Sequence, residues 1–134
     1  MNFRNILVFC ALLISASAVL ASPASDAAFA QYKSEGAGNF SAEHGKQGWT
    51  KEVLSQEGEK RSCTTCHGSD TTKSGKHATT KKVIEPMAVN VNVERYTDLK
   101  KIEKWFKRNC EWAWGRECTA QEKGDFLKFL TSAN

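Results

Sequence analysis

Cys63-Thr64-Thr65-Cys66-His67 is the most informative stretch of this chain. Its two thiols are three residues apart, so on one helical turn they lie on the same side and each can add to a vinyl group of a haem. His67 follows directly, and its imidazole is then held beside the iron as an axial ligand. The spacing predicts one covalently attached haem c, bound through Cys63 and Cys66, with His67 on the metal.

Two other kinds of site share part of this pattern. A redox-active dithiol would use the two cysteines alone, and His67 would be incidental. A zinc site would need Cys110 and Cys118 as further ligands, but seven intervening residues are an unusual spacing for zinc. Both readings therefore explain the stretch less well than haem attachment does.

The chain begins with a segment that is typical of export. Arg4 supplies a positive charge, and residues 6–20 form an apolar run of about 15 residues, where a membrane-spanning helix needs roughly 20. Small residues ending at Ala21 predict a signal peptide over residues 1–21, cleaved after Ala21. An uncleaved membrane anchor is the alternative. We therefore expect a bacterial periplasmic protein with no stable membrane insertion after cleavage, in a compartment where cysteines are paired or modified.

Residues 22–134 are expected to form one monohaem domain, because about 110 residues are too few for two hydrophobic cores. The formal net charge is only +4, and no dense run of lysine and arginine indicates a nucleic-acid partner. A haem would fill part of the core. The aromatic side chains that could surround it are those of Trp49, Trp105, Phe106, Trp112, Trp114, Phe126 and Phe129.

Helical patterns account for most of this domain. The apolar periodicity predicts helices over residues 24–33, 42–54, 98–110 and from 120 onward, with Ser41, Thr97 and Thr119 as caps. Thr119 and Glu122 match a capping box. Residues 68–82 are expected to be a polar surface loop, and residues 83–93 an extended segment without a partner strand.

The second axial ligand of the iron is not fixed by the haem motif. Met87 is the simplest candidate for an electron carrier, and His44 and His77 are further ones. Helical steps from Leu99 through Ile102 and Phe106 reach Asn109, which is then expected to point inward. A buried amide needs a partner, and that partner is either iron or a nearby backbone group.

Several motifs resemble one known family. They are Cys63-Thr64-Thr65-Cys66-His67-Gly68, Lys104-Trp105, Arg108-Asn109-Cys110 and Gly115-Arg116-Glu117-Cys118-Thr119. Over about residues 41–130 the chain resembles the sphaeroides haem protein family of oxygen-binding cytochromes c. Met87 departs from the pattern, because the family has an aliphatic residue there.

The resemblance implies a fold and a set of roles. It implies an all-α, class I-like cytochrome c fold in which His67 is the proximal ligand, Asn109 the distal ligand, and Cys110 is disulfide-bonded to Cys118. It also implies binding of O2, NO and CO at reduced iron, and a dihaem cytochrome c as the electron donor.

Three functions follow from these ligands. The favoured one is an electron-accepting cytochrome whose distal site opens on reduction, because an amide oxygen is a hard donor that suits ferric better than ferrous iron. A simple electron carrier with Met87 as sixth ligand is the second. An O2- or NO-consuming oxidoreductase is the third, but no spacing in the sequence identifies the proton donor that turnover would need.

Overall fold

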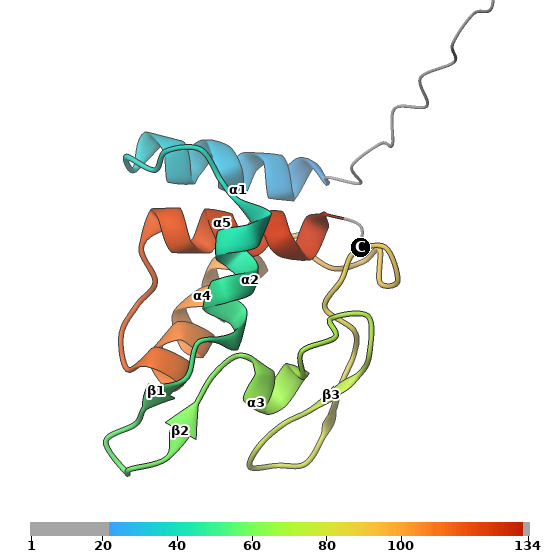
Figure 1. Ribbon diagram of the computed structural model, residues 1–134. Helices are drawn as coiled ribbons and strands as arrows, with labels where there is room; N and C mark the ends of the chain where they lie inside the picture. The colour runs from blue at the N-terminus through green and yellow to red at the C-terminus, as the bar shows by residue number, and fades with distance from the viewer. Residues whose placement is uncertain (1–21, 133–134) are drawn as a thin grey trace, which may run out of the picture.

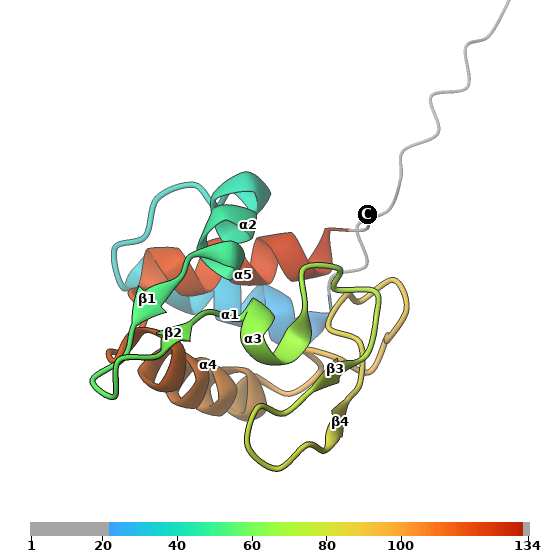
Figure 2. The ribbon, with the colours of Figure 1, turned by 60° about the horizontal axis from the view of Figure 1, so that its bottom comes forward.

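The computed structural model describes residues 22–132, so the predicted signal peptide lies outside the described residues. The helices are α1 (Pro23–Ser34), α2 (Ala42–Thr50), α3 (Thr64–His67), α4 (Leu99–Trp114) and α5 (Ala120–Thr131). The strands are β1 (Val53–Leu54), β2 (Lys60–Arg61), β3 (Gly75–Lys76) and β4 (Val83–Ile84). Figure 1 shows α3 with β1, β2 and β3 below α1 and α5, and Figure 2 shows β4 beside β3. None of the helices in residues 22–132 has the length and apolar character that crossing a bilayer requires.

Helix α5 lies at the centre, between α1 and α2, as Figure 1 shows. The contact between α2 and α5 depends on Gly45, because a Cβ there would lie 2.1 Å from the carbonyl oxygen of Asp125. The buried carboxylate of Asp125 also accepts a hydrogen bond from the backbone N–H of Ser41, at 2.7 Å. A glycine that weakens the helical pattern of the sequence is thus what lets the two helices meet.

Side-chain caps set where the helices begin. Ser22, Ser41 and Thr119 each accept a hydrogen bond from a backbone N–H in the first turn, and Thr119 with Glu122 forms the predicted capping box. The prediction of Thr97 as a cap is wrong by one residue. Asp98 caps α4 instead, because its carboxylate accepts from the N–H of Lys101 at 3.1 Å.

Two other element predictions need correction. Helix α2 ends at Thr50, so Val53 and Leu54 belong to β1, which pairs with β2. Residues 83 and 84 do have a partner strand, since β4 pairs antiparallel with β3 inside the expected polar loop. Backbone hydrogen bonds form this ladder, so it needs no alternating apolar side chains.

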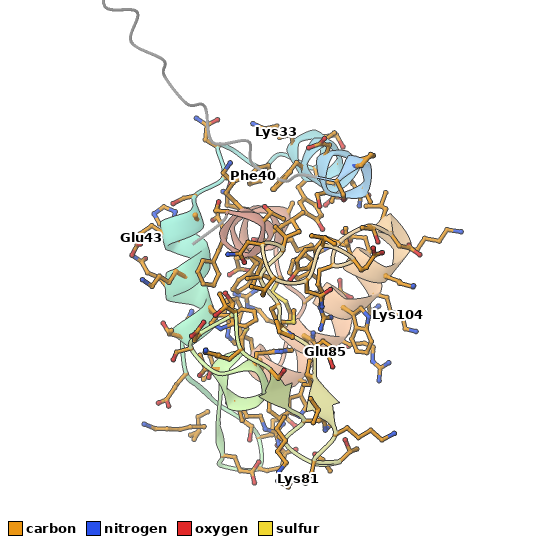
Figure 3. All side chains as sticks on the ribbon, turned by 90° about the vertical axis from the view of Figure 1, so that its right-hand side faces the viewer. Lys33, Phe40, Glu43, Lys81, Glu85 and Lys104 are labelled. Carbon is orange, nitrogen blue, oxygen red and sulfur yellow. A yellow bond between two sulfur atoms is a disulfide. The ribbon has the colours of Figure 1, made fainter. Side chains whose placement is uncertain are left out.

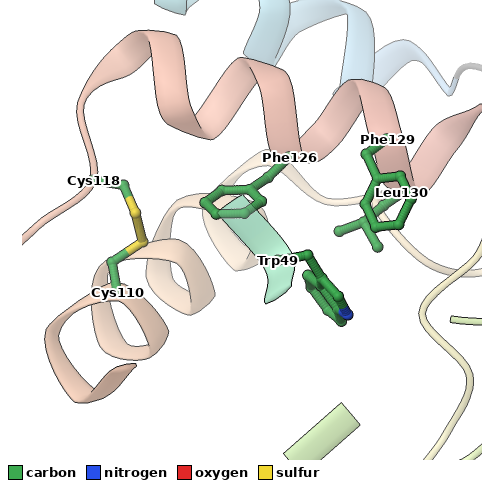
Figure 4. Close-up of a cluster of buried hydrophobic side chains, with 6 residues drawn as sticks. All are labelled: Trp49, Cys110, Cys118, Phe126, Phe129 and Leu130. Carbon is green, nitrogen blue, oxygen red and sulfur yellow. A yellow bond between two sulfur atoms is a disulfide. The ribbon is translucent and has the colours of Figure 1, made fainter. Parts of the chain in front are cut away.

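The core consists of two adjoining clusters. Figure 4 shows the first, made by Trp49, Cys110, Cys118, Phe126, Phe129 and Leu130. The second contains Ala28, Tyr32, Ile102 and Leu127. Charged side chains such as Glu43, Lys81 and Lys104 point away from both clusters (Figure 3). The apolar side chains of α5 that form the core are Phe126, Leu127, Phe129 and Leu130, all of which are buried.

Candidate haem site

Helix α3 is a single turn that carries the two cysteines and the histidine. Its start is fixed by the buried Ser62, whose backbone N–H donates to Oγ1 of Thr65 at 3.0 Å. Gly68 ends the turn with φ of 71°, a backbone conformation that favours glycine. Cys63 and Cys66 are half-buried and are not disulfide-bonded. Residues 63–67 therefore present two thiols and one imidazole within a single helical turn.

The imidazole of His67 is suited to metal ligation because its surroundings keep it neutral. Burial, with smaller contributions from the charges of Arg95 and His77, lowers the pKa of His67 to about 4. The Trp49 ring lies 5.3 Å from the His67 ring, and the Trp49 indole N–H donates to the carbonyl oxygen of Gly68 at 2.9 Å. Trp49 thus packs on the imidazole and also holds the residue that follows it.

The cysteines divide into two chemical roles. Cys110 and Cys118 are joined by a disulfide between the last turn of α4 and the residue before the cap of α5. This bond removes them as zinc ligands, and no group of three or more metal-binding side chains is found within residues 22–132. Burial raises the pKa of the Cys63 thiol to about 12, so Cys63 is a neutral thiol in the fold.

A second segment is tied firmly beside His67. Three side chains, which we call the clamp, donate to three successive carbonyls: Asn92 and Arg95 to Pro86, Arg95 also to Glu85, and Tyr96 to Met87. The backbone N–H of Met87 donates to the carbonyl oxygen of Thr71 at 2.9 Å, four residues beyond His67. The clamp therefore fixes the backbone of residues 85–87, and the charge of Arg95 contributes to the lowered pKa of His67.

The other histidines have different surroundings. The side chain of His44 is 68% exposed, and its Nδ1 lies 4.0 Å from the carboxylate of Asp125. His77 is exposed, and its Nδ1 accepts hydrogen bonds from the backbone N–H groups of Thr79 and Thr80. Neither of these contacts involves a residue of the haem-binding turn.

The expected inward direction of Asn109 is wrong. The buried line of α4 runs through Ile102, Cys110 and Ala113, with Phe106 half-buried, whereas Asn109 is exposed to solvent. From Phe106 the helix takes a four-residue step to Cys110 rather than a three-residue step to Asn109. The disulfide accounts for this, because it holds Cys110 against the core beside Cys118.

Asn109 instead lies on a neighbouring face of α4 that carries two indoles. Trp105 is one turn before Asn109 and 50% exposed, and the half-buried Trp112 is one turn after it. The guanidinium of Arg61 lies 4.9 Å from the Trp112 ring centroid, and Arg61 is two residues before Cys63. This contact brings the beginning of the haem-binding turn next to the face that carries Asn109.

These residues fit a covalently bound haem. The two thiols have the required spacing, His67 is a neutral nitrogen donor, and the indoles of Trp105 and Trp112 supply apolar area for a flat ring. When haem is bound, Cys63 and Cys66 would hold the macrocycle and His67 the iron. Asn109 would supply an amide oxygen from α4.

Some of the residues that shape the site were not found from sequence. Arg95 and Gly75 act through contacts with segments about 10 to 30 residues away, and the chain gives no local signal for such contacts. Gly75 is the clearest case, since a Cβ there would lie 2.3 Å from the carbonyl oxygen of Cys66. Only Gly68 could have been identified in advance, because it directly follows the histidine and ends the turn.

Comparison with known proteins gives consistent matches. The family model described as a domain of unknown function, DUF1924, matches residues 35–130. Cytochrome c-type protein SHP of Cereibacter sphaeroides is 38% identical over 122 residues, covering 87% of this chain and 94% of that protein. Cytochrome c'' of Methylophilus methylotrophus is 33% identical over 86 residues, covering 64% of this chain and 60% of that protein.

Solved structures match over most of the described residues. Oxidised SHP, an oxygen binding cytochrome c, superposes with a TM-score of 0.75 at 33% identity, covering 84% of this chain and all 100% of that one. Oxidised cytochrome c'' from Methylophilus methylotrophus superposes with a TM-score of 0.72 at 27% identity, covering 83% of this chain and 95% of that one.

Proposed function

Since the chain belongs to the family of the c-type cytochrome SHP and carries covalently bound haem c, we propose that it is a periplasmic cytochrome with a redox-gated site for a diatomic gas. The family resemblance and the all-α, class I-like cytochrome c fold are confirmed by these relatives. The proposal concerns what the chain does with its haem.

When bound, the haem would supply one-electron redox chemistry and a site for a small ligand. Cys63 and Cys66 would anchor the macrocycle, and the half-buried, neutral imidazole of His67 would bind the iron. Asn109 contributes an amide oxygen, a hard and weak donor that holds ferric iron better than ferrous iron. Asn109 would therefore hold the site in the oxidised protein and leave it free for O2 or NO in the reduced protein.

The observation that carries this proposal is the position of Asn109. It is exposed between two indoles on a face of α4 that reaches the haem-binding turn through Arg61 and Trp112. An exposed amide can leave a metal without leaving a buried polar group unpaired.

A Met87-ligated electron carrier is the second candidate. Met87 is half-buried and packs against the same core cluster as Cys63, which favours a site near the haem. The clamp, however, fixes the Met87 backbone, whose N–H donates to the carbonyl oxygen of Thr71. That placement supports a packing role for Met87.

An O2- or NO-consuming oxidoreductase is the third candidate, and a dihaem cytochrome c is the electron donor that we propose.

Spectra of the holoprotein test the distal ligand. We expect Asn109→Ala to leave the ferric iron open or bound by water and to change the ligand-field bands of the visible spectrum. Met87→Ala is the matched control and should leave these bands almost unchanged. Ferrous wild-type protein should bind CO rapidly. A sulfur-to-iron charge-transfer band in the ferric wild type that is lost in Met87→Ala would establish the electron-carrier function instead.

Acid-acetone extraction tests the attachment separately. The colour should remain with the wild-type protein and be lost from the protein when Cys63→Ala and Cys66→Ala are combined. Colour that leaves the wild-type protein with the solvent would contradict thioether attachment.

A further inference from the structure

Residues 71–84 form a strongly basic segment, which we call the basic hairpin. Strands β3 and β4 pair within it, with Gly75 opposite Ile84 and Lys76 opposite Val83. The segment contains four lysines, Lys73, Lys76, Lys81 and Lys82, and no carboxylate. Its charge therefore equals the formal net charge of the whole chain, +4, and the rest of the chain is balanced.

The charges of the basic hairpin face solvent without carboxylate partners. All four lysines are exposed. The lysines that form ion pairs within residues 22–132 are Lys60, Lys107 and Lys123, none of which belongs to the hairpin. Asp70 is the nearest acidic residue before the hairpin. Its carboxylate accepts hydrogen bonds from the backbone N–H and the hydroxyl of Thr72. The hairpin thus offers a concentrated positive potential.

The tip of the hairpin is held in shape by His77. Its Nδ1 accepts from Thr79 and Thr80 at 3.2 and 3.1 Å, and its backbone N–H donates to the carbonyl oxygen of Lys82 at 2.9 Å. The N–H of Lys81 closes the turn by donating to the carbonyl oxygen of His77. The lysine backbones are therefore ordered before any partner arrives, which lowers the entropy cost of binding.

The basic hairpin also lies directly on the haem-binding turn. Gly75 packs on the Cys66 carbonyl so closely that no side chain fits, and the backbone N–H of Ala78 lies 3.3 Å from Cys66 Sγ. A cavity of about 500 Å³ separates α3 from the hairpin, with Thr64, Thr65 and Cys66 on one side and Lys76 and Val83 on the other. Val83 is 68% exposed at its rim. Because Cys66 would carry one thioether bond to the haem, an electron that enters here would arrive next to the cofactor.

From this combination we propose that the basic hairpin is the docking surface for an acidic electron-donor protein. The lysines attract the donor, the exposed Val83 and the cavity receive an apolar contact, and one electron passes from the reduced donor to the ferric haem beside Cys66. The donor loses one electron and the haem gains one, and no bond or proton is exchanged. Transient redox encounters use small surfaces and electrostatic steering, and this surface has both features. This inference rests on the proposed function in one respect, namely that the haem accepts an electron.

Helix α4 provides a matched comparison. Lys100 and Lys104 are also exposed, and Figure 3 shows Lys104 on a different side of the molecule from Lys81. The variants Lys76→Glu/Lys82→Glu and Lys100→Glu/Lys104→Glu change the net charge equally. Any difference between them therefore reports where the donor binds rather than how much charge the protein carries.

Stopped-flow reduction of the ferric holoprotein by a reduced acidic [2Fe–2S] ferredoxin tests the docking surface. At low ionic strength we expect the Lys76→Glu/Lys82→Glu variant to react about tenfold more slowly than wild type, with a flatter salt dependence. The α4 variant should stay within about threefold of wild type. Both variants should keep the wild-type midpoint potential and visible spectrum.

Equal slowing of the two variants, or greater slowing of the α4 variant, would overturn the docking proposal. These outcomes leave the proposed function intact, because that function is judged by the distal-ligand spectra. Conversely, spectra that show Met87 as the ligand would overturn the gas-binding function and would leave the docking result unaffected.

Discussion

Trp49 and Trp114 both pack against the core, but only one of their indole N–H groups has an acceptor. Trp49 donates to the carbonyl oxygen of Gly68 at 2.9 Å, whereas the Trp114 Nε1 is buried and lacks a hydrogen-bond partner within residues 22–132. A satisfied buried hydrogen bond stabilises a fold by about 0.5–1.5 kcal/mol, and an unpaired buried donor costs about 1–3 kcal/mol. The two indoles should therefore respond differently to the same substitution.

Trp49→Phe and Trp114→Phe test this difference in the holoprotein. Both keep an aromatic ring, but only Trp49→Phe removes a hydrogen bond that the fold uses. We expect Trp49→Phe to lower the free energy of unfolding by about 1–3 kcal/mol more than Trp114→Phe does. Urea denaturation measures both values, and equal losses would contradict the role of the Trp49 hydrogen bond.

Single residues also mark the limit of what sequence reasoning could predict. The cysteine spacing and the following histidine identify the haem-binding turn, because attachment chemistry depends on neighbours in the chain. The direction of Asn109 could not be predicted, since steps of three and four residues both fit a helix. Only a bond to a distant cysteine decides that Cys110, not Asn109, faces the core.

The basic hairpin shows the same limit for a larger unit. Its sequence lacks apolar alternation, so it reads as a loop, but β3 and β4 pair and lie on α3. Glycine permits this contact, because a Cβ at position 75 would clash with the backbone of Cys66 and His67. In contrast, the capping box of α5 was predicted correctly because all of its parts lie within four residues.

Gly75→Ala tests how closely the hairpin must approach α3. The added Cβ would lie 2.3 Å from Cys66 O and 2.8 Å from His67 Cα, so the hairpin has to move away. We expect a loss of about 1–3 kcal/mol in the free energy of unfolding, typical of overpacking. Gly38→Ala is the control, because its Cβ would make an ordinary contact at 3.5 Å with Gln121. A Gly75→Ala protein as stable as Gly38→Ala would show that the hairpin is free to shift.

The disulfide between α4 and α5 is predicted to position Asn109 as well as to add stability. Its loop is short, and the chain-entropy model gives about 2–3 kcal/mol for such a ring. Asn109 precedes Cys110, so the bond restrains the backbone that carries the amide. In the Cys110→Ala/Cys118→Ala protein we expect altered ferric ligand-field bands and faster CO binding, together with a lower melting temperature. A lower melting temperature with unchanged spectra and rates would leave the bond a purely stabilising role.

Across the molecule, the two tyrosines of the chain join separate segments. The Tyr32 hydroxyl donates to the Glu103 carboxylate, which also accepts from Lys123 at 2.8 Å, so α1, α4 and α5 are linked. The Tyr96 hydroxyl donates to the carbonyl oxygen of Met87 at 2.8 Å. Burial raises the pKa of both phenols well above the ordinary value for tyrosine.

This burial predicts how the protein unfolds in alkali. A raised pKa in the folded state means that the stability from the buried phenols is complete below the ordinary tyrosine pKa of about 10 and is lost as the pH rises above it. We expect both tyrosinates to appear in one cooperative step, together with the loss of helical circular dichroism. In urea both should titrate near pH 10. Absorbance at about 295 nm measures this, and a tyrosinate step near pH 10 with the helices intact would refute it.

The neutral, half-buried thiol of Cys63 sets the order of events in making the protein. The thiolate is the reactive form of cysteine, and a thiol whose pKa is raised to about 12 supplies almost none at neutral pH. If the chain folds before haem is attached, the thiol of Cys63 therefore becomes poorly reactive. We therefore expect haem to be attached more readily while residues 63–67 are still unfolded, so rapid folding of the haem-free chain should lower the yield of holoprotein.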